Sequence, residues 1–293
     1  MTLDNWRTTG NYFEYKGSQI FYQRGGKGPV LLLLHGFPTA SWDFHSFWKP
    51  LQQHFTVLAI DFIGFGFSDK PPKHPYSIFD QANLTEQFLE QQQVKTYHVL
   101  SHDYGDTVAQ ELVARNNERK NDPNTNQPKL LSLCLLNGGL FPETHQALFI
   151  QKILMGPLGV WVANFFTKGK LKKNFQKIFG PNTQPQENDI TAFWELMVYK
   201  NGKRVFPLLI RYMRERKTYR QRWVGALQQT TIPLYLINGT SDPISGKHMV
   251  ARYRELIPNP QVTELDSIGH YPQLEAPSQV MQCFLDFFNR IEN

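Results

Sequence analysis

Short apolar runs alternate with longer helical patterns along most of this chain, and no other feature constrains the fold as strongly. Seven runs rich in Val, Leu and Ile predict strands, at 19–23, 30–34, 57–60, 97–100, 131–136, 234–237 and 261–265. Patterns with helical periodicity lie between them, for example at 79–92, 107–116 and 280–291. This alternation predicts an α/β protein with a mostly parallel sheet and helices on both faces. In such sheets, catalytic groups gather at the carboxyl ends of the strands.

The alternation stops near residue 139 and resumes near residue 232. The interval is helix-rich and aromatic, and residues 141–230 hold 15 Lys and Arg against 5 Asp and Glu, although the whole chain has a net charge of only +6. We therefore predict a core domain formed by residues 1–139 and 231–293, and a helical cap inserted at 140–230.

The strand predicted at 97–100 leads directly into the sequence SHDYG, at 101–105. Asp103 lies between this strand and a helix, with Ser101 and Gly105 as small neighbours. A strand, a tight turn and a helix form the setting of a nucleophile elbow, which lifts the central side chain above the sheet. Aspartate at this position also serves as an ordinary helix cap. Asp106, slightly later, is expected to cap or solvate the start of the helix.

Two later segments strengthen the catalytic interpretation of Asp103. Asp242 follows the strand at 234–237, and His270 follows the strand at 261–265. The order Asp103, Asp242, His270 is that of nucleophile, acid and base in α/β-hydrolases. Asp266 competes with Asp242 as the acid, but Asp242 better matches the expected strand end.

Several motifs are similar to those of α/β-hydrolases of the epoxide hydrolase and haloalkane dehalogenase group. The matching segments, which span the chain from about residue 12 to its end, are HGFP (35–38), DFIGFGFSD (61–69), SHDYGD (101–106), NGTSDP (238–243) and GHYPQLEAP (269–277). The resemblance implies that Asp103 is the nucleophile and that Asp242 orients His270 as the base. The backbone amides of Phe37 and Tyr104 are the implied oxyanion hole.

An aspartate nucleophile suits displacement at a saturated carbon. A carboxylate needs no base to ionise it at neutral pH, and it forms an alkyl ester with the enzyme. His270 then activates a water molecule that hydrolyses this ester. Opening of an epoxide and expulsion of a halide both fit this chemistry.

The group that assists the leaving atom distinguishes these two reactions. Epoxide hydrolases use phenol donors from the cap, and we select Tyr212 first and Tyr199 second, with Tyr219 as a weaker candidate. Dehalogenases place an indole N–H after the nucleophile, where this chain has Tyr104. Cap tryptophans, Trp161 or Trp223, are the remaining halide donors. We therefore predict an epoxide hydrolase that converts a lipophilic epoxide to a diol, with haloalkane dehalogenase as the alternative.

The basic cap also allows a membrane-docked or non-catalytic protein as a second alternative. The apolar segment 155–166 precedes Lys168, Lys170, Lys172 and Lys173, a pairing that suits an anionic bilayer. A solvated basic face over an apolar pocket explains the same residues. No nucleic-acid-binding motif accompanies the charge.

The remaining expectations are negative. The first ten residues lack the apolar segment of a secretory signal, so we expect a cytoplasmic protein, peripheral to a membrane at most. Cys134 and Cys283 are expected to be buried free thiols, because neither lies in a metal-ligand spacing. We expect no metal and no cofactor, and the oligomeric state stays open.

Overall fold

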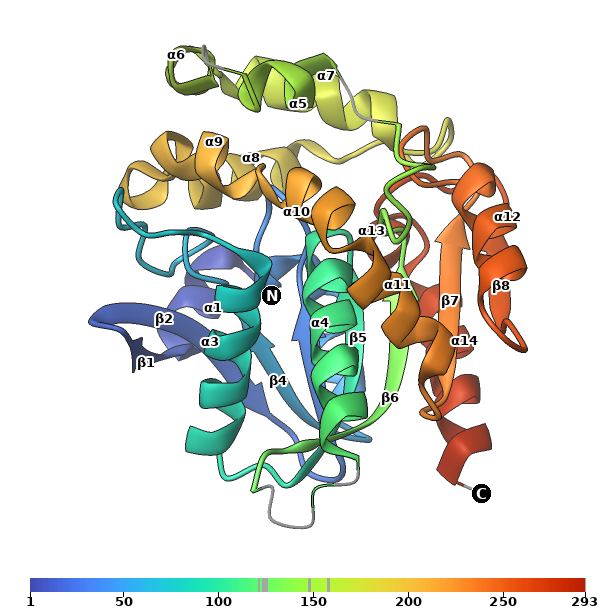
Figure 1. Cartoon of the computed structure of the whole chain (residues 1–293). Helices are drawn as coiled ribbons and strands as arrows, with labels where there is room; N and C mark the ends of the chain where they lie inside the picture. Colours follow the sequence, from blue (N-terminus) through green and yellow to red (C-terminus); the bar gives the residue numbers. More distant parts are fainter. Residues whose placement is uncertain (121, 123–125, 147–148, 157–158, 293) are drawn as a thin grey trace.

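One eight-stranded sheet forms the centre of the molecule, in the order β1-β2-β4-β3-β5-β6-β7-β8. The computed structural model describes residues 1–120, 122, 126–146, 149–156 and 159–292 (Figure 1). The strands are β1 (Asn11–Tyr15), β2 (Ser18–Gly25), β3 (Val30–Leu34), β4 (Thr56–Ile60), β5 (Thr96–His102), β6 (Lys129–Leu136), β7 (Leu234–Gly239) and β8 (Val262–Leu265).

The strands from β4 to β8 pair in parallel, whereas β2 is antiparallel to both β1 and β4. The predicted α/β class and the mostly parallel sheet are therefore confirmed. All seven predicted strands are present, and β1 is the addition. The alternating burial of β1 is that of an edge strand, and its NYFEY sequence has too few apolar residues to stand out.

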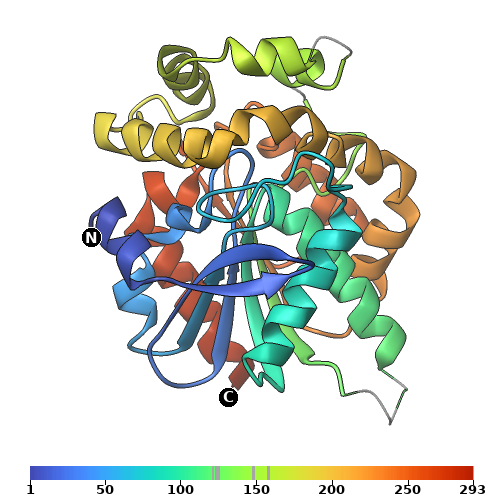
Figure 2. The same ribbon diagram turned by 90° about the vertical axis from the view of Figure 1, so that its left-hand side faces the viewer.

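Helices cover both faces of the sheet (Figures 1 and 2). One face carries α3 (Ile78–Gln91), α4 (Tyr104–Arg119) and α11 (Arg220–Gln229), and the other carries α1 (Leu3–Thr9), α2 (Trp48–Leu51) and α14 (Pro277–Glu292). Helix α12 (Lys247–Leu256) connects β7 to β8. The amphipathic α14 buries Val280, Phe284 and Phe287, as its periodicity predicts.

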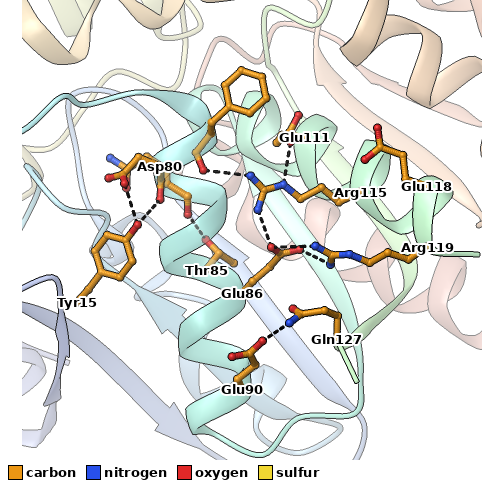
Figure 3. Close-up of polar contacts among 12 residues, drawn as sticks. Tyr15, Asp80, Thr85, Glu86, Glu90, Glu111, Arg115, Glu118, Arg119 and Gln127 are labelled. Carbon is orange, nitrogen blue, oxygen red and sulfur yellow. Dashed lines mark hydrogen bonds and ion pairs between the residues drawn. The ribbon is translucent and has the colours of Figure 1, made fainter. Parts of the chain in front are cut away.

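A network of ion pairs joins α3 to α4 on the first face (Figure 3). The Glu86 carboxylate accepts hydrogen bonds from Arg115 and Arg119, each at 2.6 Å. Arg115 also donates to Glu111, one helical turn earlier, at 2.8 Å. These partly buried, charge-assisted hydrogen bonds hold α3 against α4.

Within the described residues, six α-helices of the segment predicted to be the cap lie above the carboxyl ends of the strands (Figures 1 and 2). They are α5 (Phe149–Leu154), α6 (Gly159–Asn164), α7 (Lys168–Ile178), α8 (Glu187–Val198), α9 (Phe206–Leu209) and α10 (Tyr212–Thr218). Helix α11, which the predicted boundaries assign to the cap, lies instead against α4. The indole of Trp223 donates to Glu111 at 2.9 Å, and Arg222 donates to the same carboxylate at 2.7 Å.

Both cysteines are free thiols. Cys134 is buried in β6, but Cys283 is only partly buried, because it lies at the edge of the apolar face of α14. None of the described helices has the length and apolarity needed to cross a bilayer. The described residues also contain no cluster of His, Cys, Asp and Glu side chains that could hold a metal ion.

Candidate active site

Asp103 lies at the tight turn between β5 and α4, above the carboxyl edge of the sheet. Its backbone has φ 47° and ψ −100°, a conformation that costs a non-glycine residue about 1–3 kcal/mol. The turn also requires the glycine two residues later, because a Cβ atom on Gly105 would lie 2.3 Å from the carbonyl oxygen of Leu34. The backbone of Asp103 is thus strained, and this conformation places the Asp103 side chain at the carboxyl edge of the sheet.

The Asp103 carboxylate is nearly buried and receives hydrogen bonds from both core and cap. The backbone amide of Phe37, in the loop after β3, donates to Oδ2 at 3.1 Å. The phenol of Tyr212, at the start of α10, lies 3.5 Å from Oδ1. The Tyr104 amide belongs to the first turn of α4, so the helix itself does not use it. No contact among the described residues joins this amide to the carboxylate.

His270 and Asp242 form the second half of the site. The Nδ1 atom of His270 lies 2.7 Å from Oδ2 of Asp242. The competing carboxylate, Asp266, accepts a hydrogen bond from Thr240 at 3.2 Å instead. Further donors hold the Asp242 carboxylate, namely the amide of Ile244 at 2.7 Å, Ser245 Oγ at 2.6 Å and Asn137 Nδ2 at 3.1 Å.

Asn137 is a site residue that the sequence argument did not identify. It follows β6 with a positive φ of 39°, which asparagine tolerates better than most residues. Its side chain accepts from the amide of Gly239 at 2.7 Å and donates to Asp242. Asn137 therefore connects the ends of β6 and β7 and fixes the Asp242 carboxylate. An Asn-Gly-Gly sequence directly after a predicted strand was the available signal.

Electrostatics favour a charged pair between His270 and Asp242. Burial alone would lower the pKa of His270, but the Asp242 charge and hydrogen bond, together with the Asp103 charge, raise this pKa to about 9. Burial would raise the pKa of Asp242, but His270 and the donors around the carboxylate lower it to about 2. His270 is thus protonated at neutral pH.

Tyr212 is held in place as a hydrogen-bond donor. Burial and the neighbouring Asp103 charge raise the pKa of its phenol well above the usual value, so the hydroxyl keeps its proton. The guanidinium of Arg216 lies 4.9 Å from the centre of the Tyr212 ring and partly opposes this rise in pKa. Arg216 is itself fixed by a 2.5 Å hydrogen bond to the carbonyl oxygen of Gly139.

The structure does not bring the other cap candidates to Asp103. The Tyr199 hydroxyl accepts from Arg7 of α1 at 3.3 Å, and its ring packs on Phe67, so Tyr199 faces the outer edge of the core. Trp161 is 67% exposed, and the Trp223 indole is committed to Glu111. Tyr219 packs between Phe79 and Trp223 on the α3 face.

Asp106 does not solvate the start of α4 as expected. It is fully buried, and Ser101 Oγ donates to its Oδ1 at 2.5 Å. Burial, assisted by the charge of Asp103, raises the pKa of Asp106 well above the usual range. The expectation was wrong because helix-start periodicity does not reveal that α4 is buried on this side.

A small apolar cavity of about 70 Å³ lies over Asp103 and His270, between core and cap. Besides these two residues, its polar lining consists of Gln151 and Asn174. Its apolar walls are mostly side chains of the cap, including Leu154, Ala163, Phe166, Leu171, Phe175, Ile178, Met197 and Phe206. The cavity therefore accepts apolar groups and presents them to the side chains of Asp103 and His270.

Glu275 of α13 (Pro272–Glu275) connects the cap to the loop that carries His270. Its Oε2 atom accepts from the amide of Gly180 in the cap at 2.7 Å and from the amide of Gly269 at 2.8 Å. The amide of His270 donates in turn to the carbonyl oxygen of Ile178, at 2.8 Å. The end of α7 and the histidine loop are thus held together at the edge of the cavity.

Comparison with known proteins identifies the family of the chain. The family model described as alpha/beta hydrolase fold matches residues 29–277. The mesoderm-specific transcript protein of Mus musculus is 41% identical over 301 residues, which cover 98% of this chain and 88% of that protein. The predicted resemblance is therefore confirmed at the level of the family.

Solved structures agree with the same fold. The epoxide hydrolase CorEH superposes with a TM-score of 0.79 and 20% identity, over 97% of this chain and 99% of that one. A loop variant of the haloalkane dehalogenase DbeA from Bradyrhizobium elkanii gives a TM-score of 0.79 and 20% identity, over 97% of each chain. At this identity the two superpositions establish the fold alone. The chain belongs to the alpha/beta hydrolase family.

Proposed function

We propose that this hydrolase opens a lipophilic epoxide to a diol through a covalent ester on Asp103. One observation carries the proposal: the Asp103 carboxylate faces the Tyr212 phenol at 3.5 Å beside an apolar cavity that His270 also lines. A nucleophile, a proton donor and a base then surround the space where a substrate would react.

In the first step, Asp103 attacks one carbon of the epoxide ring. The new bond joins a carboxylate oxygen to this carbon, and the bond from the same carbon to the ring oxygen breaks. Tyr212 donates a hydrogen bond and then its proton to the departing oxygen. The product is a hydroxyalkyl ester of Asp103, and the phenol recovers a proton from solvent.

In the second step, His270 takes a proton from a water molecule, which attacks the carbonyl carbon of the ester. The amides of Phe37 and Tyr104 stabilise the resulting oxyanion. Collapse of this intermediate releases the second diol oxygen, which takes the proton from His270. Esterification removes the charge of Asp103, one of the groups that raise the His270 pKa, so His270 becomes a free base more easily when one is needed.

The surroundings of Asp103 favour an epoxide over a halide. A leaving halide needs N–H donors, and neither Trp161 nor Trp223 lines the described cavity. Haloalkane dehalogenase is the second candidate because Asn174, which lines the cavity, carries an amide that can hydrogen-bond a halide. DbeA, named as a haloalkane dehalogenase, has the same fold.

The cavity also favours a lipophilic substrate that enters as the cap moves. Its volume of about 70 Å³ is well below the roughly 300–1,000 Å³ usual for ligand sites. An ordinary substrate must therefore move the apolar walls apart, and most of those walls belong to cap helices. Burial of apolar substrate surface would offset this displacement.

A substrate panel of styrene oxide, a fatty-acid epoxide, a bromoalkane and a p-nitrophenyl ester tests the assignment. We expect a diol from the epoxides and little bromide from the bromoalkane. Bromide release without diol formation would move the assignment to dehalogenase. Inactivity on the whole panel would favour the second alternative, a protein without catalysis.

A further inference from the structure

We propose that the outer cap face docks on an anionic phospholipid membrane, from which the lipophilic substrate enters the cavity. We define this face by five residues. Trp161 lies on α6, Phe165 directly follows α6, and Lys170, Lys173 and Lys177 lie on α7. The proposal extends the proposed function by naming the source of its substrate. Docking itself can be measured without turnover, so the two proposals can fail separately.

Helix α7 has two different faces. Lys170, Lys173 and Lys177 are spaced three and four residues apart, so they form one exposed stripe. The buried stripe formed by Leu171, Phe175 and Ile178 lies on the opposite side and lines the cavity over Asp103. One helix therefore presents lysines outward and forms an apolar wall of the cavity inward.

Two exposed aromatic side chains lie beside this lysine stripe. Trp161 is 67% exposed and Phe165 is 68% exposed, more than any other large hydrophobic side chain among the described residues. They lie one helical turn apart, and the Phe165 amide donates to the Trp161 carbonyl oxygen at 3.2 Å. Lys170 Nζ donates to the Phe165 carbonyl oxygen at 3.2 Å, which places a cation next to the aromatic pair.

The charge of the outer cap face is uncompensated. Residues 144–186 include six lysines and no aspartate or glutamate. Glu187 of α8 pairs with Lys172 at 2.8 Å and with Lys168 at 3.2 Å. Within the part of the chain that the structure describes, Lys170, Lys173 and Lys177 form no ion pair. Arginines of α4, in contrast, are paired to carboxylates (Figure 3).

Exposed indole and phenyl rings beside an exposed lysine stripe are complementary to an anionic bilayer surface. Aromatic rings partition into the interface between headgroups and acyl chains, and lysines are attracted to anionic headgroups. Figures 1 and 2 place α6 and α7 in the layer of the cap farthest from the sheet, where a planar surface can reach them. A lipophilic molecule that leaves the bilayer there is one helix away from the cavity.

Co-sedimentation with vesicles tests this proposal on the full chain. Phosphatidylcholine vesicles with about a third phosphatidylglycerol should bind the protein, and pure phosphatidylcholine vesicles should bind it much less. Reversal of Lys170, Lys173 and Lys177 to Glu should weaken binding at least a hundredfold, since each lysine contributes about fivefold. Trp161→Ser with Phe165→Ser should also weaken binding, and added salt should weaken the electrostatic part.

A matched charge reversal separates this face from net charge alone. Lys95→Glu with Lys129→Glu changes two exposed lysines at the start of β5 and β6, at the opposite end of the sheet, and should leave more binding than Lys170→Glu with Lys173→Glu. Asp103→Ala should still bind vesicles, and the cap variants should still hydrolyse a small water-soluble epoxide. Equal recovery with neutral and anionic vesicles would overturn the proposal. Equal losses of vesicle binding in the two double variants would overturn it as well. Tighter binding to nucleic acid or to an acidic protein than to vesicles would reassign the face.

Discussion

The core and the cap approach Asp103 in different ways. From the core, short hydrogen bonds between 2.6 and 3.1 Å fix Asp242, His270 and the Phe37 amide around it. From the cap, the polar contact to Asp103 among the described residues is the Tyr212 phenol at 3.5 Å, and the cap side chains that line the cavity are apolar except for Gln151 and Asn174. The core is a preorganised polar frame, whereas the cap is a mostly apolar cover whose Tyr212 phenol is a donor to Asp103.

This difference suggests a division of labour. Preorganised donors and charges stabilise developing charge at low cost, so the core determines what chemistry is possible. Mostly apolar walls can adapt to the shape of an apolar substrate, so the cap determines what enters. Variants of the core should therefore affect the rate of reaction at any substrate, and variants of the cap should affect it selectively.

The largest effect should follow from a change in the core. Asp242→Asn removes the charge that holds His270 and raises its pKa, so ester hydrolysis should slow by about 10³- to 10⁴-fold for every substrate. Asp266→Asn is the matched control, because this carboxylate does not contact His270, and its rate should stay near wild type. Comparable losses in both variants, measured by steady-state kinetics, would remove the distinction between the two acids.

A smaller and more selective effect should follow from a change in the cap. Tyr212→Phe removes the donor to the departing epoxide oxygen, and we expect a loss of about a hundredfold in the rate of ester formation from epoxides. Turnover of a bromoalkane, whose leaving group needs no phenol proton, should change less. Tyr199→Phe provides the control, since this hydroxyl contacts Arg7 and not Asp103. A larger loss from Tyr199→Phe than from Tyr212→Phe would exchange their roles.

The pH dependence should be the mildest of these effects over any single pH unit. His270 must be neutral to act as a base, and its pKa is raised to about 9 while Asp103 is charged. In the ester intermediate, the pKa of His270 lies below its value in the free enzyme, because Asp103 has lost its charge. Ester hydrolysis should slow by about tenfold for each pH unit below this pKa. Single-turnover rates between pH 6 and pH 10 measure this. A rate independent of pH would exclude His270 as the base.

Protonation of His270 also affects stability. Its pKa is raised on folding, so the stabilisation from its pair with Asp242 is complete below about pH 6.5 and is lost as pH rises through about 9. Thermal denaturation of wild type should therefore approach that of His270→Gln across this interval. This measurement reads the charge of the pair without any substrate.

The sequence predicted those parts of the molecule that depend on local pattern. Apolar runs of strand length revealed seven strands, and the order of residues at their ends indicated Asp103, Asp242 and His270. The structure places these three residues at the ends of β5, β7 and β8, as the pattern predicts. Chain order is sufficient here because parallel strands bring their carboxyl ends to one edge of the sheet.

Contacts across the fold were harder to predict. Asn137 acts on the site through Asp242, 105 residues away, and Glu275 acts through Gly180, 95 residues away. Helical periodicity also could not distinguish Tyr212 from Tyr199, because it does not say which face of the cap meets the core. Similarly, it marked 155–166 as apolar without revealing that Trp161 is exposed.

The central claim is that Asp103 forms a covalent ester, and the most direct measurement is the intact mass of His270→Gln after incubation with an epoxide. This variant keeps the nucleophile but lacks the base, so the ester should accumulate. We predict a mass increase equal to one whole epoxide molecule, mapped by peptide fragmentation to Asp103 and absent when Asp103 is also replaced by Ala. An adduct on another residue, or full turnover by Asp103→Ala alone, would contradict the account.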